Sequence, residues 1–238
     1  MRQAVLALAV LLWFRPPVMG QSLAPEDNEA LTYTVNWPSG LSLGEAQFQS
    51  KKIASPAGAP ERWDLRFSLD AAIPGFTVAD RFRSVATSEL CSTEFERDTA
   101  HGQKSGKELT LFDLSAGRAT RQTLVPQGGG KSQLSIPACP KDALAFLYYV
   151  RRELAQGRLP PPQTVFFGGP YQVRLEYAGS EKLRVGDEQV EADRITASVK
   201  GAASDVTFDI FFAQDQLRRP VLVRVPLPLG AFTMELAP

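Results

Sequence analysis

Hydrophobic and polar residues alternate along most of the chain after residue 30. The pattern is clearest from Trp63 to Ala71, where every second residue is apolar and the residues between are polar or charged. Similar alternation occurs in residues 171–177, 206–212 and 221–227. A period of two is typical of a β-strand that is buried on one face. The chain is therefore predicted to be mainly β.

Turn-forming residues separate these alternating segments. Examples are Pro38-Ser39-Gly40, Ser115-Ala116-Gly117 and Gly186-Asp187. Short strands joined by frequent hairpin turns predict an antiparallel sheet of about ten strands, strongly curved or closed into an open barrel. Pro226 and Pro228 are expected at an edge or a bulge, because proline cannot donate a hydrogen bond inside a sheet.

One segment departs from the alternation, and it predicts a single long helix near residues 141–156. Pro140 and Asp142 suit the N-terminal end of a helix. Arg151-Arg152, followed by Gly157, suits the C-terminal end. Apolar residues occupy more than one side of this helix: Ala143, Leu144, Phe146, Leu147, Tyr148, Tyr149, Val150 and Leu154. Such a helix is surrounded by other elements, so we expect it in the concave face of the sheet.

The first twenty residues have the layout of a signal peptide. A basic start, Met1-Arg2-Gln3, precedes an apolar run from Ala4 to Phe14, and Val18-Met19-Gly20 provides apolar or small residues for cleavage. A membrane anchor is the alternative, but this run is too short to cross about 30 Å of hydrocarbon. We therefore expect residues 1–20 to be removed, and 21–238 to form one exported β-rich domain in the periplasm or outside the cell. No later segment is apolar enough to be expected to span a membrane.

Charge and composition exclude several function classes. The chain has 26 basic and 26 acidic residues, so nothing suggests a nucleic-acid binder. It has one histidine, His101, placed in a turn by its neighbours, and it has neither a G-x-S-x-G nor an H-E-x-x-H motif. Gln127–Ser132 ends like a phosphate-binding loop, but Val125 stands where that motif needs glycine. Enzyme activity is not expected, and neither is a metal or a cofactor.

Cys91 and Cys139 are the only cysteines. In an oxidising compartment two such residues favour a disulfide, and the alternative is two separate buried thiols. A bridge would connect the strand around Cys91 to the start of the helix. We predict the disulfide.

Four side chains are candidates for ligand contact. Asp80 shares parity with Phe76, Val78 and Phe82, so strict alternation directs it inward. It is either a ligand contact or a core carboxylate paired with arginine, unless a bulge turns it outward. The other three candidates are aromatic residues of the predicted helix: Phe146, Tyr148 and Tyr149.

Several of these features together resemble a known bacterial exported family. They are Leu31–Val35 followed by Gly44-Glu45-Ala46, then Asp142–Arg151 with Gly157, and finally Asp215–Val221. The likeness extends from about residue 30 to the C-terminus and is to domain-of-unknown-function family 3108. It implies a β-rich secreted domain and carries over no catalytic residue.

Three function classes are compatible with the sequence. A curved sheet with apolar inner residues and an aromatic helix could bind or carry a hydrophobic, lipid-like small molecule. A fully packed sheet could instead be a scaffold that engages an envelope protein. The third class is an unrecognised hydrolase. The deciding feature is whether the helix fills the concave face, and the preferred hypothesis is the carrier.

Overall fold

The computed structural model describes residues 25–54, 60–73, 75–202, 205–227 and 230–238. Within these ranges the chain forms fifteen strands and one helix. The elements are β1 (Glu29–Asn36), β2 (Ser42–Ile53), β3 (Arg62–Ile73), β4 (Phe76–Thr87), β5 (Ser92–His101), β6 (Lys104–Asp113), β7 (Arg118–Val125), β8 (Lys131–Ser135), β9 (Lys141–Asp142), α1 (Ala143–Ala155), β10 (Gln163–Phe166), β11 (Pro170–Val185), β12 (Glu188–Gly201), β13 (Asp205–Ala213), β14 (Pro220–Leu227) and β15 (Gly230–Leu236). The expectation of about ten strands was therefore wrong.

The observed strands differ from the predicted ones in two ways. Strands β5, β8 and β10 were missed because their charged or short sequences lack clean alternation. Strand β11 also extends well past the predicted segment 171–177, to Val185, and its register shifts between Tyr177 and Ser180. Hydrophobic periodicity identifies strands with one buried face, so it fails where both faces are polar.

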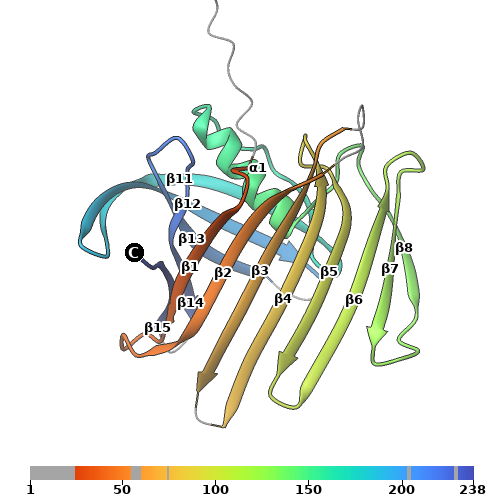
Figure 1. The fold of residues 1–238 in the computed structure, drawn as a ribbon, viewed down its shortest axis with the longest axis horizontal. Coiled ribbons are helices and arrows are strands. Elements are labelled where there is room, and N and C mark those ends of the chain that lie inside the picture. Colours follow the sequence, from red (N-terminus) through yellow and green to blue (C-terminus); the bar gives the residue numbers. More distant parts are fainter. Residues whose placement is uncertain (1–24, 55–59, 74, 203–204, 228–229) are drawn as a thin grey trace, which may run out of the picture.

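All strands belong to one large, curved, open sheet in which nearly all neighbours are antiparallel (Figure 1). We call β1–β8 the N-terminal arm and β9–β15 the C-terminal arm. The two arms are joined where β1 pairs with β15, and the outermost strands are β8 and β9. The one parallel pair among these strands is β9 with β10. Most hairpins connect neighbours directly, so the topology follows the chain along each arm.

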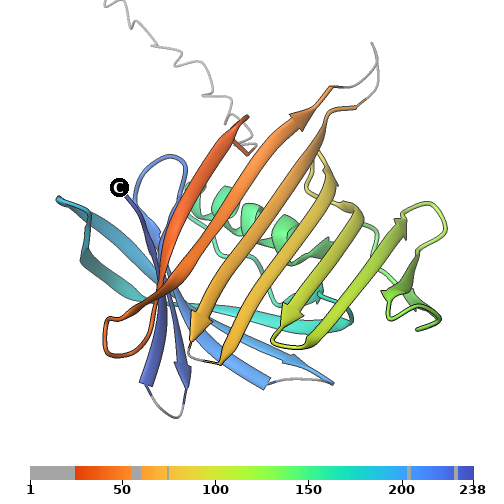
Figure 2. The ribbon, with the colours of Figure 1, turned by 60° about the horizontal axis from the view of Figure 1, so that its bottom comes forward.

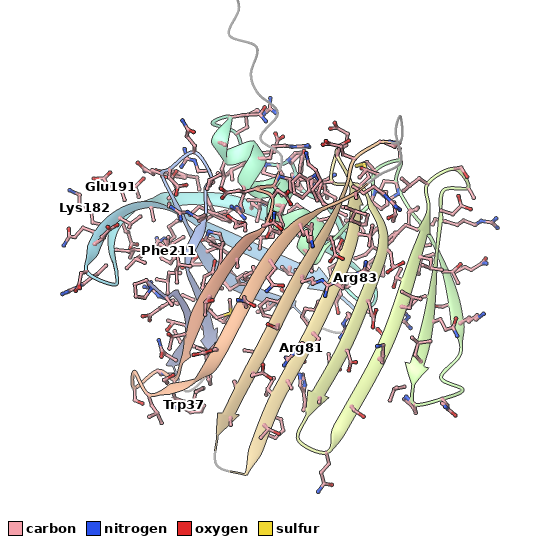
Figure 3. All side chains as sticks on the ribbon, viewed as in Figure 1. Trp37, Arg81, Arg83, Lys182, Glu191 and Phe211 are labelled. Carbon is pink, nitrogen blue, oxygen red and sulfur yellow. A yellow bond between two sulfur atoms is a disulfide. The ribbon has the colours of Figure 1, made fainter. Side chains whose placement is uncertain are left out.

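On β2–β4 the register gives the sheet an apolar inner face and a largely polar outer face. Phe48, Phe67 and Phe82 are directly paired across β2, β3 and β4, and they point inward. Because side chains alternate along a strand, Arg81 and Arg83 on β4 lie on the outer face (Figure 3). The alternation expected from Trp63 to Ala71 is thus present in β3.

The helix lies on the inner side of the sheet, between the two arms (Figure 2). One side of it, with Leu144 and Tyr148, packs into a core with Trp63 and Phe95 of the N-terminal arm. Another side, with Val150, packs into a second core formed by the C-terminal arm. The helix was expected to be enclosed on several sides, and these two cores account for its apolar circumference.

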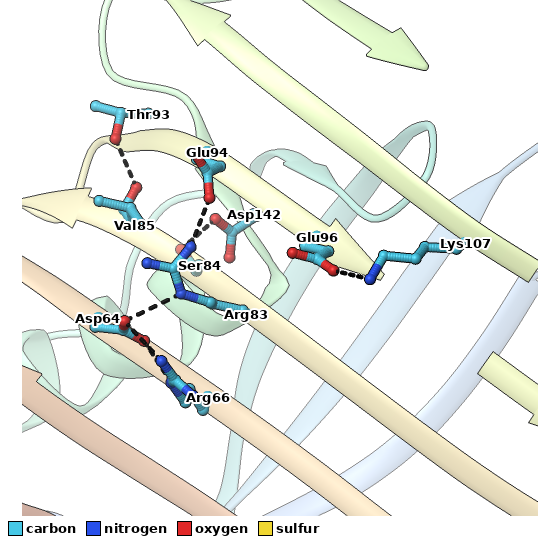
Figure 4. Close-up of polar contacts among 10 residues, drawn as sticks. All are labelled: Asp64, Arg66, Arg83, Ser84, Val85, Thr93, Glu94, Glu96, Lys107 and Asp142. Carbon is cyan, nitrogen blue, oxygen red and sulfur yellow. Dashed lines mark hydrogen bonds and ion pairs between the residues drawn. The ribbon is translucent and has the colours of Figure 1, made fainter. Parts of the chain in front are cut away.

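A buried carboxylate fixes the start of the helix. Asp142 is fully buried and accepts hydrogen bonds from the backbone N–H groups of Leu144 and Ala145, at 2.9 and 3.0 Å. Ser84 donates to its other oxygen at 2.5 Å (Figure 4), and Ser92 donates to the same oxygen at 2.6 Å. Burial raises the pKa of Asp142, and these four hydrogen bonds oppose that rise. The helix therefore begins at a position set by β4 and β5.

The predicted disulfide between Cys91 and Cys139 is present beside this anchor. Next to it, the backbone N–H of Ser92 donates to the carbonyl of Pro140 at 2.8 Å. The bridge therefore joins the chain before β5 to the chain before β9, which lie in different arms.

A buried ion pair holds the other end of the helix. The Arg151 guanidinium donates two hydrogen bonds to the carboxylate of Glu29 on β1, both at 2.7 Å, and a third to the carbonyl of Leu217 at 3.0 Å. Burial disfavours the charge on Arg151, but Glu29 outweighs it and raises the pKa of the guanidinium. The helix is thus attached to the strand at which the two arms meet.

Candidate ligand-binding cavity

A cavity of about 500 Å³ lies between the helix and the inner face of the sheet. Its walls come from both arms, and Phe146, Leu147 and Val150 of α1 form one side. The side chains that line it are apolar except for one tyrosine, Tyr171. The helix therefore lines the concave face without filling it, which is the feature that the sequence left undecided.

Phenylalanine rings form the wall on the N-terminal arm. The ring centres of Phe48 and Phe67 are 4.7 Å apart, and those of Phe67 and Phe82 are 5.5 Å apart. Phe167, which follows β10, meets Phe82 edge to face at 5.1 Å. Rings at these separations support one another, so the wall is held in place by its own contacts.

Aliphatic residues form most of the opposite wall. In register across β11, β12 and β13, Leu175 pairs with Ala197 and Ala197 with Phe208. Val173 and Val199 form the neighbouring pair. Ala197 has the smallest side chain among these five, so it leaves room at the centre of the wall.

The C-terminal wall is interrupted between β13 and β14. Their pairing ends at Asp209 and Arg224, although both strands continue beyond these residues. Figure 2 shows the two strands diverging here. Val206 and Phe208 line the cavity from the part of β13 that pairs with β12 but not with β14. Pro226 lies in the corresponding part of β14, paired only with β15 on its other side, consistent with an expected edge position.

The candidate aromatic residues of the helix point in different directions. Phe146 lines the cavity. Tyr148 is buried on another side, with the Arg151 guanidinium 4.8 Å from its ring, and burial raises its pKa to about 12. Tyr149 lies between Lys141 and Arg152, at 4.4 and 5.3 Å. Of the three, only Phe146 faces the cavity.

Asp80 is placed on the inner face, as its parity indicated, but it does not line the cavity. Its carboxylate is 2.8 Å from Nε2 of His101, and its side chain is 13% exposed. The partner is therefore a histidine and not the arginine considered from sequence. His101 itself is the last residue of β5, immediately before the turn to β6.

The sequence did not reveal a group of charged residues beside the aromatic wall. Arg97 is the register partner of Phe82, and it also pairs with Glu108 of β6. Arg121 of β7 donates to the carbonyl of Gly168, in the turn that follows Phe167. The inner face is thus apolar around the helix and polar on β5–β7. Parity within β5 would have placed Arg97 inward had that strand been recognised.

Neither a metal-binding cluster nor a membrane-spanning helix occurs among the residues that the structure describes. No three His, Cys, Asp or Glu side chains are grouped closely enough to hold a metal ion there. In the same part of the chain, no helix has the length and apolar character needed to cross a membrane.

Comparisons with known proteins agree with this fold. A search of curated proteins finds no match. A crystal structure described as a beta-barrel-like protein of domain of unknown function DUF1849 from Brucella abortus matches with a TM-score of 0.58 and 8% identity. The match covers 90% of this chain and 97% of that one, and at this identity it shows the fold alone. The model of the family described as "Protein of unknown function (DUF3108)" matches residues 32–237. The chain therefore belongs to the DUF3108 family, as the sequence features had indicated.

Proposed function

We propose that this protein binds a hydrophobic, lipid-like ligand in the cavity beside α1 and carries it in the cell envelope. The observation that supports the proposal is an apolar cavity of about 500 Å³. Binding sites for small molecules are concave, largely apolar and roughly 300–1,000 Å³ in volume. A protein core that only stabilised the fold would be packed without such a space.

The expected address in the envelope rests on two features. Residues 1–20, the expected signal peptide, lie outside the described residues. The Cys91–Cys139 disulfide favours an oxidising compartment, because such bonds rarely persist in a reducing cytosol. A lipid-like cargo suits this address, since it needs a protein to cross an aqueous space.

The lining predicts how affinity depends on the ligand. Each buried methylene contributes about 0.8 kcal/mol, so shortening an alkyl chain by two carbons should weaken binding roughly tenfold. This dependence should hold for chains that fit inside the cavity and level off once the chain is longer than the cavity. A polar ligand of equal size should bind far more weakly, because Tyr171 carries the one polar side-chain group among the lining residues.

The test is titration with a neutral lipophilic fluorophore such as phenylnaphthylamine, followed by displacement with alkyl alcohols of increasing length. Ala197→Phe places a ring in the middle of the aliphatic wall, and Leu147→Trp does so from the helix. Both variants should reduce probe binding at least tenfold. Ser198→Phe is the matched control, because Ser198 adjoins Ala197 on the same strand but has the opposite parity.

Far-UV circular dichroism checks that each variant retains the β-rich fold. Saturable binding by the natural chain and by Ser198→Phe, with weak binding by the two cavity variants, supports the proposal. Absence of saturable binding in the natural chain would exclude a carrier and favour the interaction scaffold.

A further inference from the structure

The cavity adjoins a polar region on the same inner face. In the register of the sheet, Phe82 of the cavity wall is paired with Arg97, and Arg97 is paired with Glu108. On the next strand Arg121 is paired with Thr110. Charged side chains of the N-terminal arm therefore lie beside the cavity wall, although none of them is among the residues that line it.

Arg97 lies at the boundary between the two regions. Its guanidinium carbon is 4.3 Å from the ring centre of Phe167, which lines the cavity. One terminal nitrogen is 3.2 Å from the Glu108 carboxylate. Its Nε is buried and has no hydrogen-bond partner in the described part of the chain. An unused donor of this kind is costly unless a ligand accepts from it.

Arg121 adds a second positive charge. Among the residues described, it has no acidic partner within ion-pair distance, and it contacts the carbonyl of Gly168. Gly168 also packs closely against Arg97, since a Cβ there would overlap the Arg97 guanidinium. The turn after Phe167 therefore brings the two guanidinium groups to one place.

The other charged groups on the inner face do not neutralise both Arg97 and Arg121. Glu108 is the one carboxylate that contacts either arginine among the described residues. Asp80 lies two residues before Phe82 on β4, and its carboxylate contacts His101. The region thus presents two guanidinium groups against one carboxylate. If an arginine served only to hold the turn at Gly168 in place, neither a second arginine nor the unpaired Nε of Arg97 would be needed.

From this arrangement we infer that the ligand is an amphiphile with an acidic head group, a carboxylate or a phosphate. Its apolar chain occupies the cavity, and its head group is bound by Arg97 and Arg121. This inference rests on the proposed function and specifies the class of ligand. Guanidinium groups suit this task, because their planar donors match carboxylate and phosphate oxygens in pairs. Stacking of Arg97 on Phe167 holds the charge beside apolar surface.

The experiment compares three ligands that share one alkyl chain: tetradecanoic acid, tetradecanol and tetradecyl phosphate. Each displaces the neutral fluorophore from the full mature chain, below its critical micelle concentration and at a pH where the acid is ionised. The acid, the phosphate or both should bind at least about tenfold more tightly than the alcohol. Added salt should weaken binding of the acidic ligands and leave the alcohol unchanged.

Arg97→Gln and Arg121→Gln should each remove most of this preference and leave tetradecanol binding unchanged. Arg66→Gln is the matched control, because Arg66 lies on the outer face, paired with Asp64. Arg97→Lys keeps the positive charge and should retain part of the preference for acidic ligands over tetradecanol. It provides the measurement if Arg97→Gln does not fold. The ratio of acid to phosphate affinity identifies the head group.

The outcomes separate this inference from the proposed function. Equal affinity for all three ligands, unaffected by either glutamine variant, would overturn the inference and leave hydrophobic binding in place. If none of the three displaces the fluorophore, the proposed function fails and this inference fails with it.

Discussion

At the scale of single residues, buried ionisable side chains fix the position of the helix. Asp142 and the Arg151–Glu29 pair are almost fully buried, yet each has hydrogen-bond partners at short distance. Burial of charge is costly, and these partners offset the cost. Such groups add little stability over an apolar core, but they fix where α1 begins and ends. The cavity depends on that placement, because α1 is one of its walls.

Replacement of Asp142 tests the first anchor. Asp142→Ala removes the helix cap and leaves the hydroxyls of Ser84 and Ser92 without their acceptor, so we expect a loss of about 3 kcal/mol. Asp142→Asn keeps an acceptor for the cap and should cost about 1 kcal/mol. Urea unfolding gives both free energies. Asp113→Ala, at the exposed end of β6, is the control and should change stability far less. Equal losses for Asp142→Ala and Asp142→Asn would contradict this account.

The second anchor predicts strong coupling. Glu29→Leu or Arg151→Met alone leaves an uncompensated buried charge, so each should destabilise by about 3–5 kcal/mol. Glu29→Leu combined with Arg151→Met removes both charges and should cost much less than the sum of the single changes. A double-mutant cycle by urea unfolding measures the coupling. Additive losses would mean that the two residues act independently.

At the scale of elements, the sequence predicts best the strands that have one apolar face. The alternation from Trp63 to Ala71 identified β3, and helical spacing together with Asp142 and Arg152 located α1 to within a few residues. By contrast, β5 carries charge on both faces, with Glu94 and Glu96 outside and Arg97 inside. A strand that faces a polar part of the concave surface has no hydrophobic period to detect.

The candidate site follows the same division. Phe146 was found because it lies on the apolar side of a recognisable helix. Arg97 and Arg121 were not, because their closeness depends on the register of three strands and on the turn at Gly168. Tyr148 and Tyr149 were grouped with Phe146 by type, yet successive helix positions are rotated by about 100°. Sequence proximity on a helix therefore does not imply a shared wall.

The outer face of β3–β5 carries a pH-dependent contribution to stability. Asp64 accepts hydrogen bonds from Arg66 at 2.8 Å and from Arg83 at 3.0 Å (Figure 4). Partial burial would raise the pKa of Asp64, but the two arginines outweigh it and hold the pKa below the ordinary value of 3.8. A lowered pKa stabilises the fold above the ordinary value, and this stabilisation is lost as pH falls through the lowered one.

Asp64→Asn should therefore destabilise the protein by about 1 kcal/mol at neutral pH. The difference from the natural chain should shrink as pH falls from the ordinary value of 3.8 through the lowered pKa, because Asp64 is then neutral, as asparagine is. Urea unfolding across a pH series measures it. A difference that stays constant down to the lowest pH at which the protein folds would show that the arginines do not hold the charge of Asp64.

At the scale of the whole molecule, two arms of one sheet surround a helix and leave an apolar space. Among the strands described, the two arms are paired by sheet hydrogen bonds only where β1 meets β15, at the far side from β8 and β9. What holds them together elsewhere is α1, which packs against both, and the contacts around Asp142. The cavity volume therefore depends on how firmly the chain before α1 is tied to β5.

The Cys91–Cys139 disulfide makes that tie covalent, and its removal is the last prediction. The bridge closes a loop with a sequence separation of 48, for which the chain-entropy model gives about 4 kcal/mol. Cys91→Ser combined with Cys139→Ser should lose most of this free energy, measured by urea unfolding. Because the bridge joins the two arms beside the first turn of α1, binding of the neutral fluorophore should weaken as well. Reduced natural protein should behave like the double variant. Unchanged stability in both samples would show that the two arms are held by the helix and the buried carboxylate alone.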